Sequence, residues 1–365
     1  MIRFLDLQRQ HCEIETGVNE AVASVVRAGR FILGEQVTAF ETEWAGYCGV
    51  PDAAGVASGT DALTLALIAT GAVRPGHEDE VITSPLTASY TAVAIIKAGG
   101  VPVFADIDPQ TYTLDANALL RAITPHTRAV VPVHLYGQMC DMGALCSTAA
   151  RHGLIVVEDA AQAHGARLGD RSAGAFGTAG AFSFYPTKNL GACGDAGVVV
   201  SVDQNVIKVV KTLRQAGTHD ALQEDVLGWN SRLDEIQAAI LRAKLPYLDQ
   251  WNQKRRSLAA LYSAELRGIP KLRLPAAISD DAHVWHLYVV QHPERDRLLA
   301  YLSARGIETL VHYPFLLHQQ RLLRSSAQRA LPVAEKVAPR LLSLPLYPEL
   351  KVDEAYEVVR AIRSF

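Results

Sequence analysis

Short apolar segments alternate with helix-like segments between about residues 53 and 201. This alternation predicts repeated strand and helix units, in which helices cover a mostly parallel sheet. The predicted strands are Ala53–Ala57, Glu80–Thr83, Pro102–Ala105, Ala129–His134, Leu154–Glu158, Ala179–Phe184 and Gly197–Ser201. The helices predicted between them are Asp61–Thr70, Ala88–Ala98, Asp115–Ala122 and Asp141–His152.

The later part of the chain is dominated by helical periodicity. A helix is predicted over Ser231–Leu245, with Ser231 as its N-cap and Asp234 three residues further on. A second helix, Leu248–Leu266, leads towards one clear strand, Val284–Gln291. We therefore expect an α/β fold with a large three-layer domain, residues 1–247, and a smaller C-terminal α/β domain, residues 248–365.

Composition narrows the class of protein. Of 365 residues, 49% are hydrophobic and 20% are charged, which is typical of a globular chain and excludes a disordered one. The net charge of -3 comes with scattered basic residues, so a nucleic-acid partner is disfavoured. No apolar run suits a leader or a membrane helix, and the five cysteines show no C-x-x-C spacing. These features favour a cytoplasmic protein with reduced thiols and no membrane partner.

Several common enzyme motifs are missing from the chain. No two glycines are separated by a single residue, which rules out the G-x-G-x-x-G dinucleotide fingerprint despite the α/β pattern. The P-loop, the H-E-x-x-H zinc helix and the G-x-S-x-G nucleophile elbow are absent as well. A dehydrogenase, a P-loop nucleotidase, a zinc protease and an α/β-hydrolase are therefore disfavoured, and no metal site is expected.

Polar residues instead gather at the predicted carboxyl ends of strands, where open α/β sheets bind ligands. Gly59 and Thr60 open a helix after the first strand, so they serve either as an ordinary helix start or as a phosphate site. Asp159 follows a buried strand, where it is either a turn residue or the partner of a protonated ring nitrogen.

Lys188 lies in a turn bracketed by Pro186 and Gly191, after another strand. An isolated lysine is usually a solvated surface residue, but one held over a ligand crevice can form a Schiff base. Together with Asp159 and the phosphate-binding turn at Gly59, Lys188 favours pyridoxal 5'-phosphate as cofactor. That cofactor needs a lysine, an acidic partner for its ring nitrogen and a phosphate cradle.

At this point the sequence resembles the DegT/DnrJ/EryC/StrS family of sugar aminotransferases, which have the aspartate aminotransferase type of fold. The resemblance runs from Phe4 to about Tyr347. Its most specific segments are Ser58-Gly59-Thr60-Asp61-Ala62-Leu63, Glu158-Asp159-Ala160-Ala161-Gln162-Ala163-His164-Gly165, Tyr185-Pro186-Thr187-Lys188-Asn189-Leu190-Gly191, Gly194-Asp195 and Asn230-Ser231-Arg232-Leu233-Asp234-Glu235-Ile236-Gln237-Ala238.

The resemblance implies a role for each matching residue. Lys188 matches the lysine that holds the cofactor, and Asp159 matches the partner of its pyridine nitrogen. Gln162 matches a donor to the ring hydroxyl, and the phosphate-binding positions are Gly59, Thr60 and Ser183. Asn230 matches an asparagine that reaches the cofactor of the neighbouring subunit, which implies a homodimer with shared sites. His312 and Tyr313 match a substrate-side segment. For His312, a packed or surface imidazole without a role in the reaction is an equally good interpretation.

The chain also departs from the family pattern. Ala88 stands where many members have an aromatic residue that stacks on the cofactor, and Tyr90 could substitute for it only after a backbone shift. Ala196, Ala216 and Phe315 replace a common glycine, an aromatic or histidine, and a proline. These changes fall at positions expected to set substrate selectivity.

The expected reaction is the transfer of an amino group from glutamate to a nucleotide-linked keto-deoxysugar. Related dehydratases have His at the position of Lys188, so transamination is favoured over dehydration. The segment 189–195 is most similar to that of members acting on dTDP-linked 3-keto-6-deoxyhexoses. A 4-keto sugar, a UDP-linked sugar, or a cofactor-binding regulatory protein without turnover remain the alternatives.

Overall fold

The computed structural model describes residues 1–74, 76–218, 227–326 and 329–365. Its centre is a seven-stranded sheet with strand order β1-β9-β8-β5-β4-β2-β3. The strands are β1 (Asp52–Val56), β2 (Glu80–Thr83), β3 (Val101–Phe104), β4 (Thr127–Val131), β5 (Ile155–Asp159), β8 (Ala179–Ser183) and β9 (Gly197–Ser201). Only β9 runs opposite to the other strands of this sheet, since it pairs antiparallel with both β1 and β8. The predicted mostly parallel sheet is confirmed.

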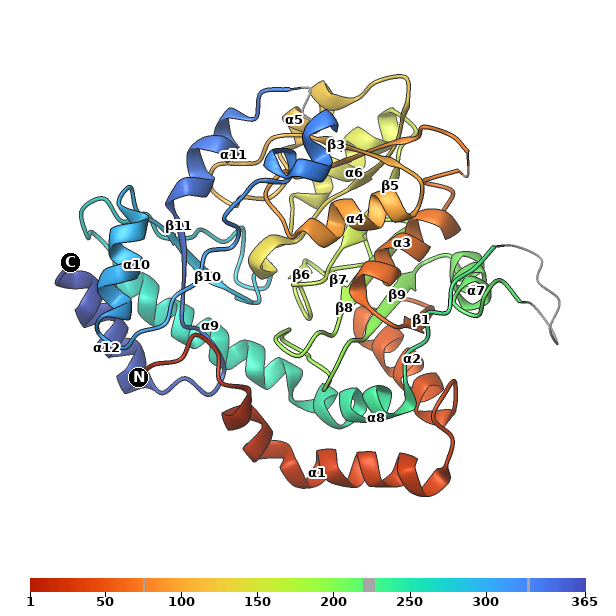
Figure 1. The fold of residues 1–365 in the computed structure, drawn as a ribbon, viewed down its shortest axis with the longest axis horizontal. Coiled ribbons are helices and arrows are strands. Elements are labelled where there is room, and N and C mark those ends of the chain that lie inside the picture. The colour runs from red at the N-terminus through yellow and green to blue at the C-terminus, as the bar shows by residue number, and fades with distance from the viewer. Residues whose placement is uncertain (75, 219–226, 327–328) are drawn as a thin grey trace.

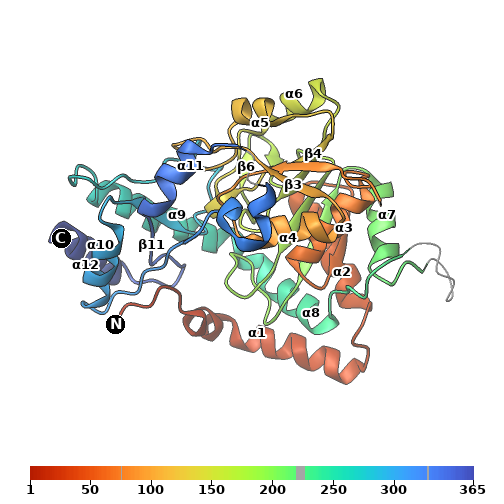
Figure 2. The same cartoon turned by 45° about the horizontal axis from the view of Figure 1, so that its top comes forward.

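Helices cover both faces of the sheet, which makes three layers (Figure 1). On one face lie α3 (Gly59–Ala69), α4 (Ser89–Lys97) and α7 (Gln204–Leu213). On the other face lie α2 (Glu35–Cys48), α5 (Ala116–Ala122), α6 (Met142–Arg151) and α8 (Glu235–Lys244). α1 (Leu7–Ala28) runs along α8 on the outside of the second group, as Figure 2 also shows.

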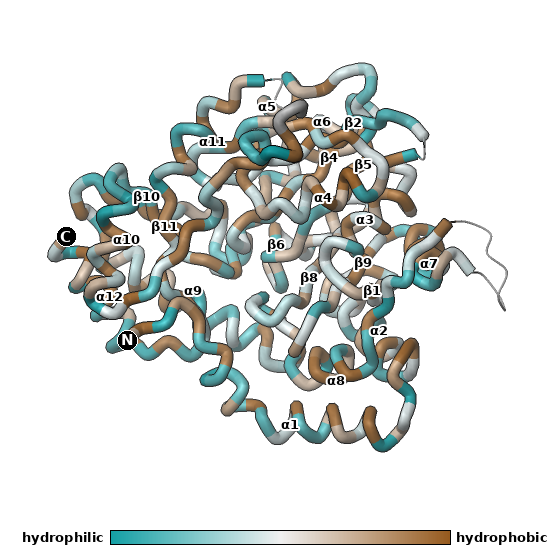
Figure 3. The backbone as a smooth tube through the Cα atoms, viewed as in Figure 1, coloured by the Kyte–Doolittle hydropathy of each residue, from teal (hydrophilic) through white to brown (hydrophobic). Residues whose placement is uncertain are grey.

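Strand β9 shows why helices must cover both faces of the sheet. Successive side chains of a strand point to opposite faces. Val198 and Val200 enter the core beneath α2 and α8, whereas Val199 enters the core beneath α3 and α7. All five residues of β9 are buried. An apolar run of this kind belongs in the middle of a three-layer fold. Figure 3, which colours the chain by residue hydropathy, shows hydrophobic stretches in the central strands and also in the helices around them.

A second, smaller core lies at the C-terminal end of the chain. It is built around an antiparallel pair of strands, β10 (Tyr288–Gln291) and β11 (Leu341–Leu344). The helices against this pair are α9 (Leu248–Glu265), α10 (Arg295–Ser303) and α12 (Val352–Arg363). The N-terminus joins this core through Ile2, so both chain ends lie on the same side of the molecule (Figure 1). We propose that the two units meet near residue 247, within the helical run from α8 to α9.

Short elements complete the chain. A two-stranded ribbon is formed by β6 (Arg167–Leu168) and β7 (Arg171–Ser172). The remaining helix is α11 (Pro332–Val337). The 3-10 turns are η1 (Leu135–Gly137), η2 (Leu245–Tyr247), η3 (Leu317–Gln319), η4 (Arg321–Ser326) and η5 (Ala338–Arg340). No helix in the described ranges combines the length and the apolar character that crossing a bilayer requires.

Two predicted elements are present but begin at later residues than predicted. The helix expected from Ser231 begins at Glu235, because the Ser231 hydroxyl donates to Asp61 Oδ2 (2.8 Å) instead of capping. The strand expected from Val284 begins at Tyr288, because Trp285 has a φ of 50°, which an extended strand excludes. α1 and α2 were not predicted at all.

Candidate active site

The candidate residues come from the carboxyl ends of neighbouring strands. β5 ends at Asp159 and β8 ends at Ser183, and the two strands pair in parallel with Asp159 opposite Ala181. The turn that carries Lys188 follows β8, and α3 begins at Gly59 after β1. Parallel neighbours end at the same edge of a sheet, which is where open α/β sheets bind ligands.

Asp159 is nearly buried, with 9% of its surface exposed. Its Oδ2 accepts a hydrogen bond from the Thr91 hydroxyl (2.8 Å), and its Oδ1 accepts one from the Ala161 amide (3.2 Å). Within the described part of the chain, no cation lies at ion-pair distance from this carboxylate. A buried carboxylate with so few donors is costly unless a ligand supplies a cation, so Asp159 suits a protonated ring nitrogen.

Lys188 lies in a tight turn, in which its amide donates to the Tyr185 carbonyl (2.9 Å). Burial lowers the pKa of its ammonium to about 8, and the negative charge of Asp159 opposes that shift. An amine with this pKa has a substantial neutral fraction near neutral pH, as nucleophilic attack and proton removal require. Lys188 therefore differs chemically from a solvated surface lysine.

The residue after the lysine is anchored on three sides. Asn189 is buried, and its Nδ2 donates to Asn252 Oδ1 (2.8 Å) and to the Val284 carbonyl (3.0 Å). Its Oδ1 accepts from His286 Nδ1 (3.0 Å). Burial holds the pKa of His286 well below its usual value, so the ring is neutral with its proton on Nδ1. This network fixes the backbone that carries Lys188.

The start of α3 forms a cradle next to Ser183. The Ser58 hydroxyl caps the helix by accepting from the Asp61 amide (3.1 Å), which leaves the amides of Gly59 and Thr60 without helical partners. A side chain at Gly59 would collide with Ser183, since an added Cβ would lie 2.4 Å from Ser183 Cβ and 3.0 Å from Oγ. The hydroxyl thus stands against the helix start, and this arrangement fits a phosphate group.

Gln162 is held by two tyrosines. Its Oε1 accepts from the Tyr136 amide (2.6 Å) and its Nε2 donates to the Tyr313 hydroxyl (3.0 Å). One hydrogen of the Gln162 amide is left for another acceptor. Burial raises the pKa of Tyr313 to about 12, and the charge of Asp159 adds to that shift. The structure thus brings Gln162 and Tyr313 together.

His312 is also part of this region. Its Nδ1 lies 2.9 Å from Ser343 Oγ, and its backbone carbonyl accepts from the Tyr136 hydroxyl. Burial, with the positive charge of Lys188 as a second cause, lowers the pKa of His312 to about 4. The imidazole is therefore neutral near pH 7. It lies close enough to Lys188 for the lysine's charge to affect its pKa.

A cavity of about 550 Å³ opens beside the lysine turn. Thr187, the neighbour of Lys188, lines it together with His286, His312 and Arg255. The first residues of the chain close its other side, from Arg3 to Gln8. Sequence reasoning missed His286, Arg255, Thr91 and Tyr136, because each reaches the site through a contact between distant segments and carries no local motif.

Two predicted positions lie outside this cluster. Asn230 is exposed, and its backbone forms an isolated bridge with Gln215. Ala88 is the N-cap of α4, whereas Tyr90 is a surface residue with 67% of its area exposed. Tyr90 therefore does not replace the missing aromatic residue in this conformation.

Comparisons with known proteins identify the family of the chain. The DegT/DnrJ/EryC1/StrS aminotransferase family matches residues 13–363. A dTDP-3-amino-3,4,6-trideoxy-alpha-D-glucose transaminase from Streptomyces venezuelae is 45% identical, covering 100% of this chain and 96% of its own. A UDP-N-acetyl-3-dehydro-alpha-D-glucosamine 3-aminotransferase from Acidithiobacillus ferrooxidans is 42% identical, covering 99% and 97%. A protein named pleiotropic regulatory protein, from Geobacillus stearothermophilus, is 43% identical, covering 100% and 98%.

Solved structures give the same result. DesV of S. venezuelae in complex with a ketimine intermediate superposes with a TM-score of 0.96 at 44% identity, covering 100% of this chain and 98% of that one. NtdA from Bacillus subtilis with bound cofactor PMP has a TM-score of 0.91 at 32% identity, covering 100% and 85%. The chain belongs to the DegT/DnrJ/EryC1/StrS aminotransferase family.

Proposed function

We propose that this protein is a pyridoxal 5'-phosphate dependent aminotransferase that moves an amino group from glutamate to a nucleotide-linked keto-deoxysugar. The observation that carries the proposal is that Lys188, whose pKa burial lowers to about 8, lies close enough to the nearly buried carboxylate of Asp159 for its charge to oppose that shift. Asp159 ends β5, and the turn of Lys188 follows β8, the parallel neighbour of β5. A regulatory protein without turnover would need neither group in this state.

The residues present fit the cofactor. Lys188 Nζ would bond to its aldehyde carbon, and Asp159 would accept from its ring nitrogen. Gly59, Thr60 and Ser183 would hold its phosphate, and the remaining Gln162 hydrogen would serve its ring hydroxyl. When bound, the cofactor supplies an electron sink for the carbon that loses a proton.

The residues of the chain divide the other tasks. Lys188 Nζ would act as the base that takes the proton from the carbon bearing the amino group, and it would hold that proton for return. Asp159 keeps a proton on the ring nitrogen, because a buried carboxylate favours a neighbouring positive charge. The neutral His312 and the un-ionised Tyr313 offer hydrogen bonds without adding charge beside Lys188.

We assign the acceptor as a dTDP-linked 3-keto-6-deoxyhexose. The two transaminases named above support amination at carbon 3. One is named for a dTDP-linked sugar and the other for a UDP-linked sugar. The cavity of about 550 Å³ beside Thr187 has room for a substrate of this size.

We also propose a homodimer with shared sites, in which Asn230 serves the partner's cofactor. The exposed position of Asn230 supports this, because a residue that reaches another subunit must lie on the surface of its own. A cytoplasmic location stays a prediction.

The function is tested with cofactor-loaded protein, glutamate and a panel of nucleotide keto-sugars, followed by mass spectrometry. The panel pairs dTDP with UDP and 3-keto with 4-keto sugars. We expect an amino sugar from the dTDP-linked 3-keto compound, with the highest kcat/KM. Amination of another member alone would correct the substrate, and no amination of any member would favour the regulatory alternative.

A further inference from the structure

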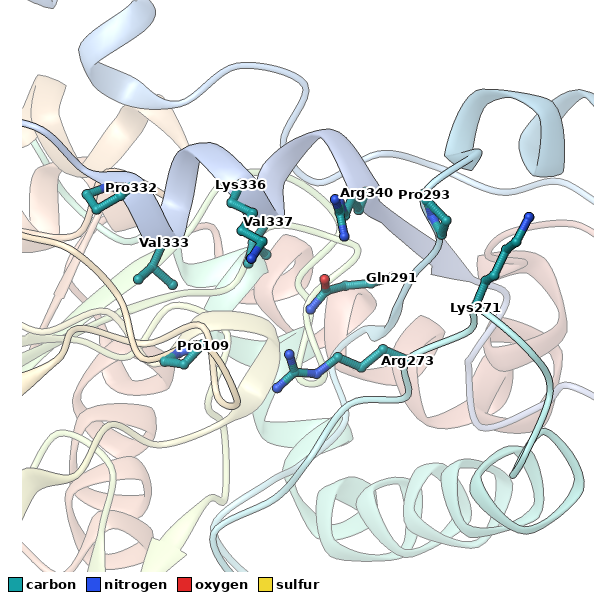
Figure 4. Close-up of a pocket in the computed structure, with 10 residues that line it drawn as sticks. All are labelled: Pro109, Lys271, Arg273, Gln291, Pro293, Pro332, Val333, Lys336, Val337 and Arg340. Carbon is teal, nitrogen blue, oxygen red and sulfur yellow. The ribbon is translucent and has the colours of Figure 1, made fainter.

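A second pocket, of about 450 Å³, is lined by the residues labelled in Figure 4, none of which belongs to the lysine turn. Pro109, which follows β3, forms one wall, and Arg273 and Gln291 form its floor. The segment from Pro332 to Arg340, which contains α11, covers the other side. The pocket shares no lining residue with the cavity beside Thr187. It therefore needs an explanation of its own.

The lining is strongly basic. Four of the ten lining residues are cations, Lys271, Arg273, Lys336 and Arg340, and none is Asp or Glu. Lys271 pairs with Glu294 (3.1 Å). Across the described ranges, the side chains of the other three take part in no ion pair or hydrogen bond. Uncompensated cations around one pocket attract an anion.

Two carboxylates close to Pro109 in the sequence, Asp106 and Asp108, are engaged elsewhere. Asp106 accepts from the amides of Val333 and Ala334 (2.8 and 2.9 Å). Asp108 accepts from the amides of Gln110 and Thr111 (2.8 and 2.9 Å). Both carboxylates are thus held by backbone amides, and within the described residues neither forms an ion pair with a cation of the pocket.

Gln291 adds a specific polar group. It is buried, with 7% of its surface exposed, and its Nε2 donates to the Tyr112 hydroxyl (2.7 Å). Its Oε1 accepts no hydrogen bond from any described residue, and Figure 4 shows this oxygen turned towards the space below Lys336 and Arg340. This oxygen is able to accept a hydrogen bond from a ligand, so we expect the ligand to carry a hydroxyl or N–H as well as negative charge.

The remaining walls are apolar. They consist of three prolines and two valines, namely Pro109, Pro293, Pro332, Val333 and Val337. Flat apolar surfaces of this kind pack against a sugar or base ring, and the volume lies within the range of small-ligand sites. Inorganic phosphate would use the cations but not these apolar walls.

We propose that this pocket binds a nucleoside diphosphate. Arg273, Lys336 and Arg340 hold the diphosphate, Gln291 Oε1 accepts from a hydroxyl or base N–H, and the prolines contact the ring. Arginine suits this role because its planar fork matches phosphate oxygens. The site is separate from the one that binds substrate in the proposed reaction.

Calorimetric titration of the holoenzyme with thymidine diphosphate tests the proposal. The double variant Arg273→Ala/Lys336→Ala should weaken one binding event at least tenfold, or lower the stoichiometry by one molecule per chain. KM for the keto-sugar should stay unchanged. The matched control is Arg267→Ala/Arg360→Ala, which removes two exposed cations elsewhere in the C-terminal unit and should bind like the wild type.

Two further arms identify the ligand. Inorganic pyrophosphate should bind the wild type several-fold more weakly than thymidine diphosphate. Gln291→Met should weaken the binding of thymidine diphosphate but not that of pyrophosphate. Unchanged binding by the double variant overturns the site, and equal affinity of the wild type for the two ligands overturns the nucleoside assignment. Neither result depends on whether the protein turns over a sugar.

Discussion

Asn189 Nδ2 donates to Asn252 Oδ1 across 2.8 Å, joining the turn of Lys188 to α9. Both side chains are buried, with 2% and 1% of their surfaces exposed. The Nδ2 of Asn252 in turn donates to the His164 carbonyl (2.8 Å). The lysine turn is therefore fixed by a helix more than sixty residues further along the chain.

This pair predicts a stability effect. Asn252→Leu removes the acceptor for Asn189 and leaves two buried polar groups short of a partner. We expect the free energy of unfolding to fall by about 1–3 kcal/mol per unpaired group. Urea denaturation measures it, and Asn205→Leu, at an exposed position, is the control. An effect no larger than that of the control would show that water replaces the lost contact.

The pKa of Lys188 predicts a pH dependence. The neutral amine attacks the cofactor aldehyde, so the rate of cofactor uptake by apoprotein should rise with pH and level off above about 8. Asp159 favours the protonated amine, so Asp159→Asn should move the midpoint to lower pH. Stopped-flow absorbance follows the uptake. A rate that still rises towards pH 10.5, the ordinary value for lysine, would contradict the buried environment.

Asp159 should matter for turnover rather than folding. A neutral amide in Asp159→Asn loses a charge-assisted hydrogen bond of about 3 kcal/mol, which corresponds to a roughly hundredfold lower kcat/KM. The variant should keep its melting temperature and its cofactor. Asp170→Asn, at an exposed position, provides the matched control. Near-normal turnover in the Asp159 variant would refute its role.

The shared-site proposal predicts complementation between subunits. Lys188→Ala and Asn230→Ala chains, mixed and allowed to exchange, should form hybrid dimers in which one of the two sites has both residues. Such mixtures should exceed the activity of either parent. Tagged chains verify exchange, and the Asn230 variant must itself be impaired. If verified hybrids are no more active than the average of the parents, the shared-site proposal is wrong and Asn230 serves only its own chain.

The site residues at strand ends could be predicted from the sequence for a physical reason. Asp159 and Lys188 follow strands, and strand ends in a mostly parallel sheet converge on one edge. A local apolar pattern locates each strand, so Gly59 and Ser183 could be placed without knowledge of the rest of the fold. The surface position of Tyr90, by contrast, depends on the orientation of α4, which turns this side chain towards solvent.

Other parts depend on contacts that no local pattern encodes. Ser231 looked like a helix cap, but its hydroxyl reaches Asp61 across the fold. Thr91 reaches Asp159, and Asn252 reaches Asn189, over 68 and 63 residues. Polar side chains of these types are common throughout any chain, so only tertiary structure distinguishes those that meet. α1 and α2 were missed because they precede the strand and helix alternation that guided the assignment.

The most direct measurement of the central claim is borohydride reduction of the cofactor-loaded protein, followed by peptide mapping. Reduction makes the bond between the cofactor and its lysine permanent. Because bond formation releases water and reduction adds two hydrogens, the mass of one peptide rises by that of the cofactor less one oxygen atom. We predict a single labelled peptide that contains Lys188, and no labelled peptide in Lys188→Ala. Labelling of another lysine, or an unlabelled chain in cofactor-replete protein, would contradict the assignment of the active site.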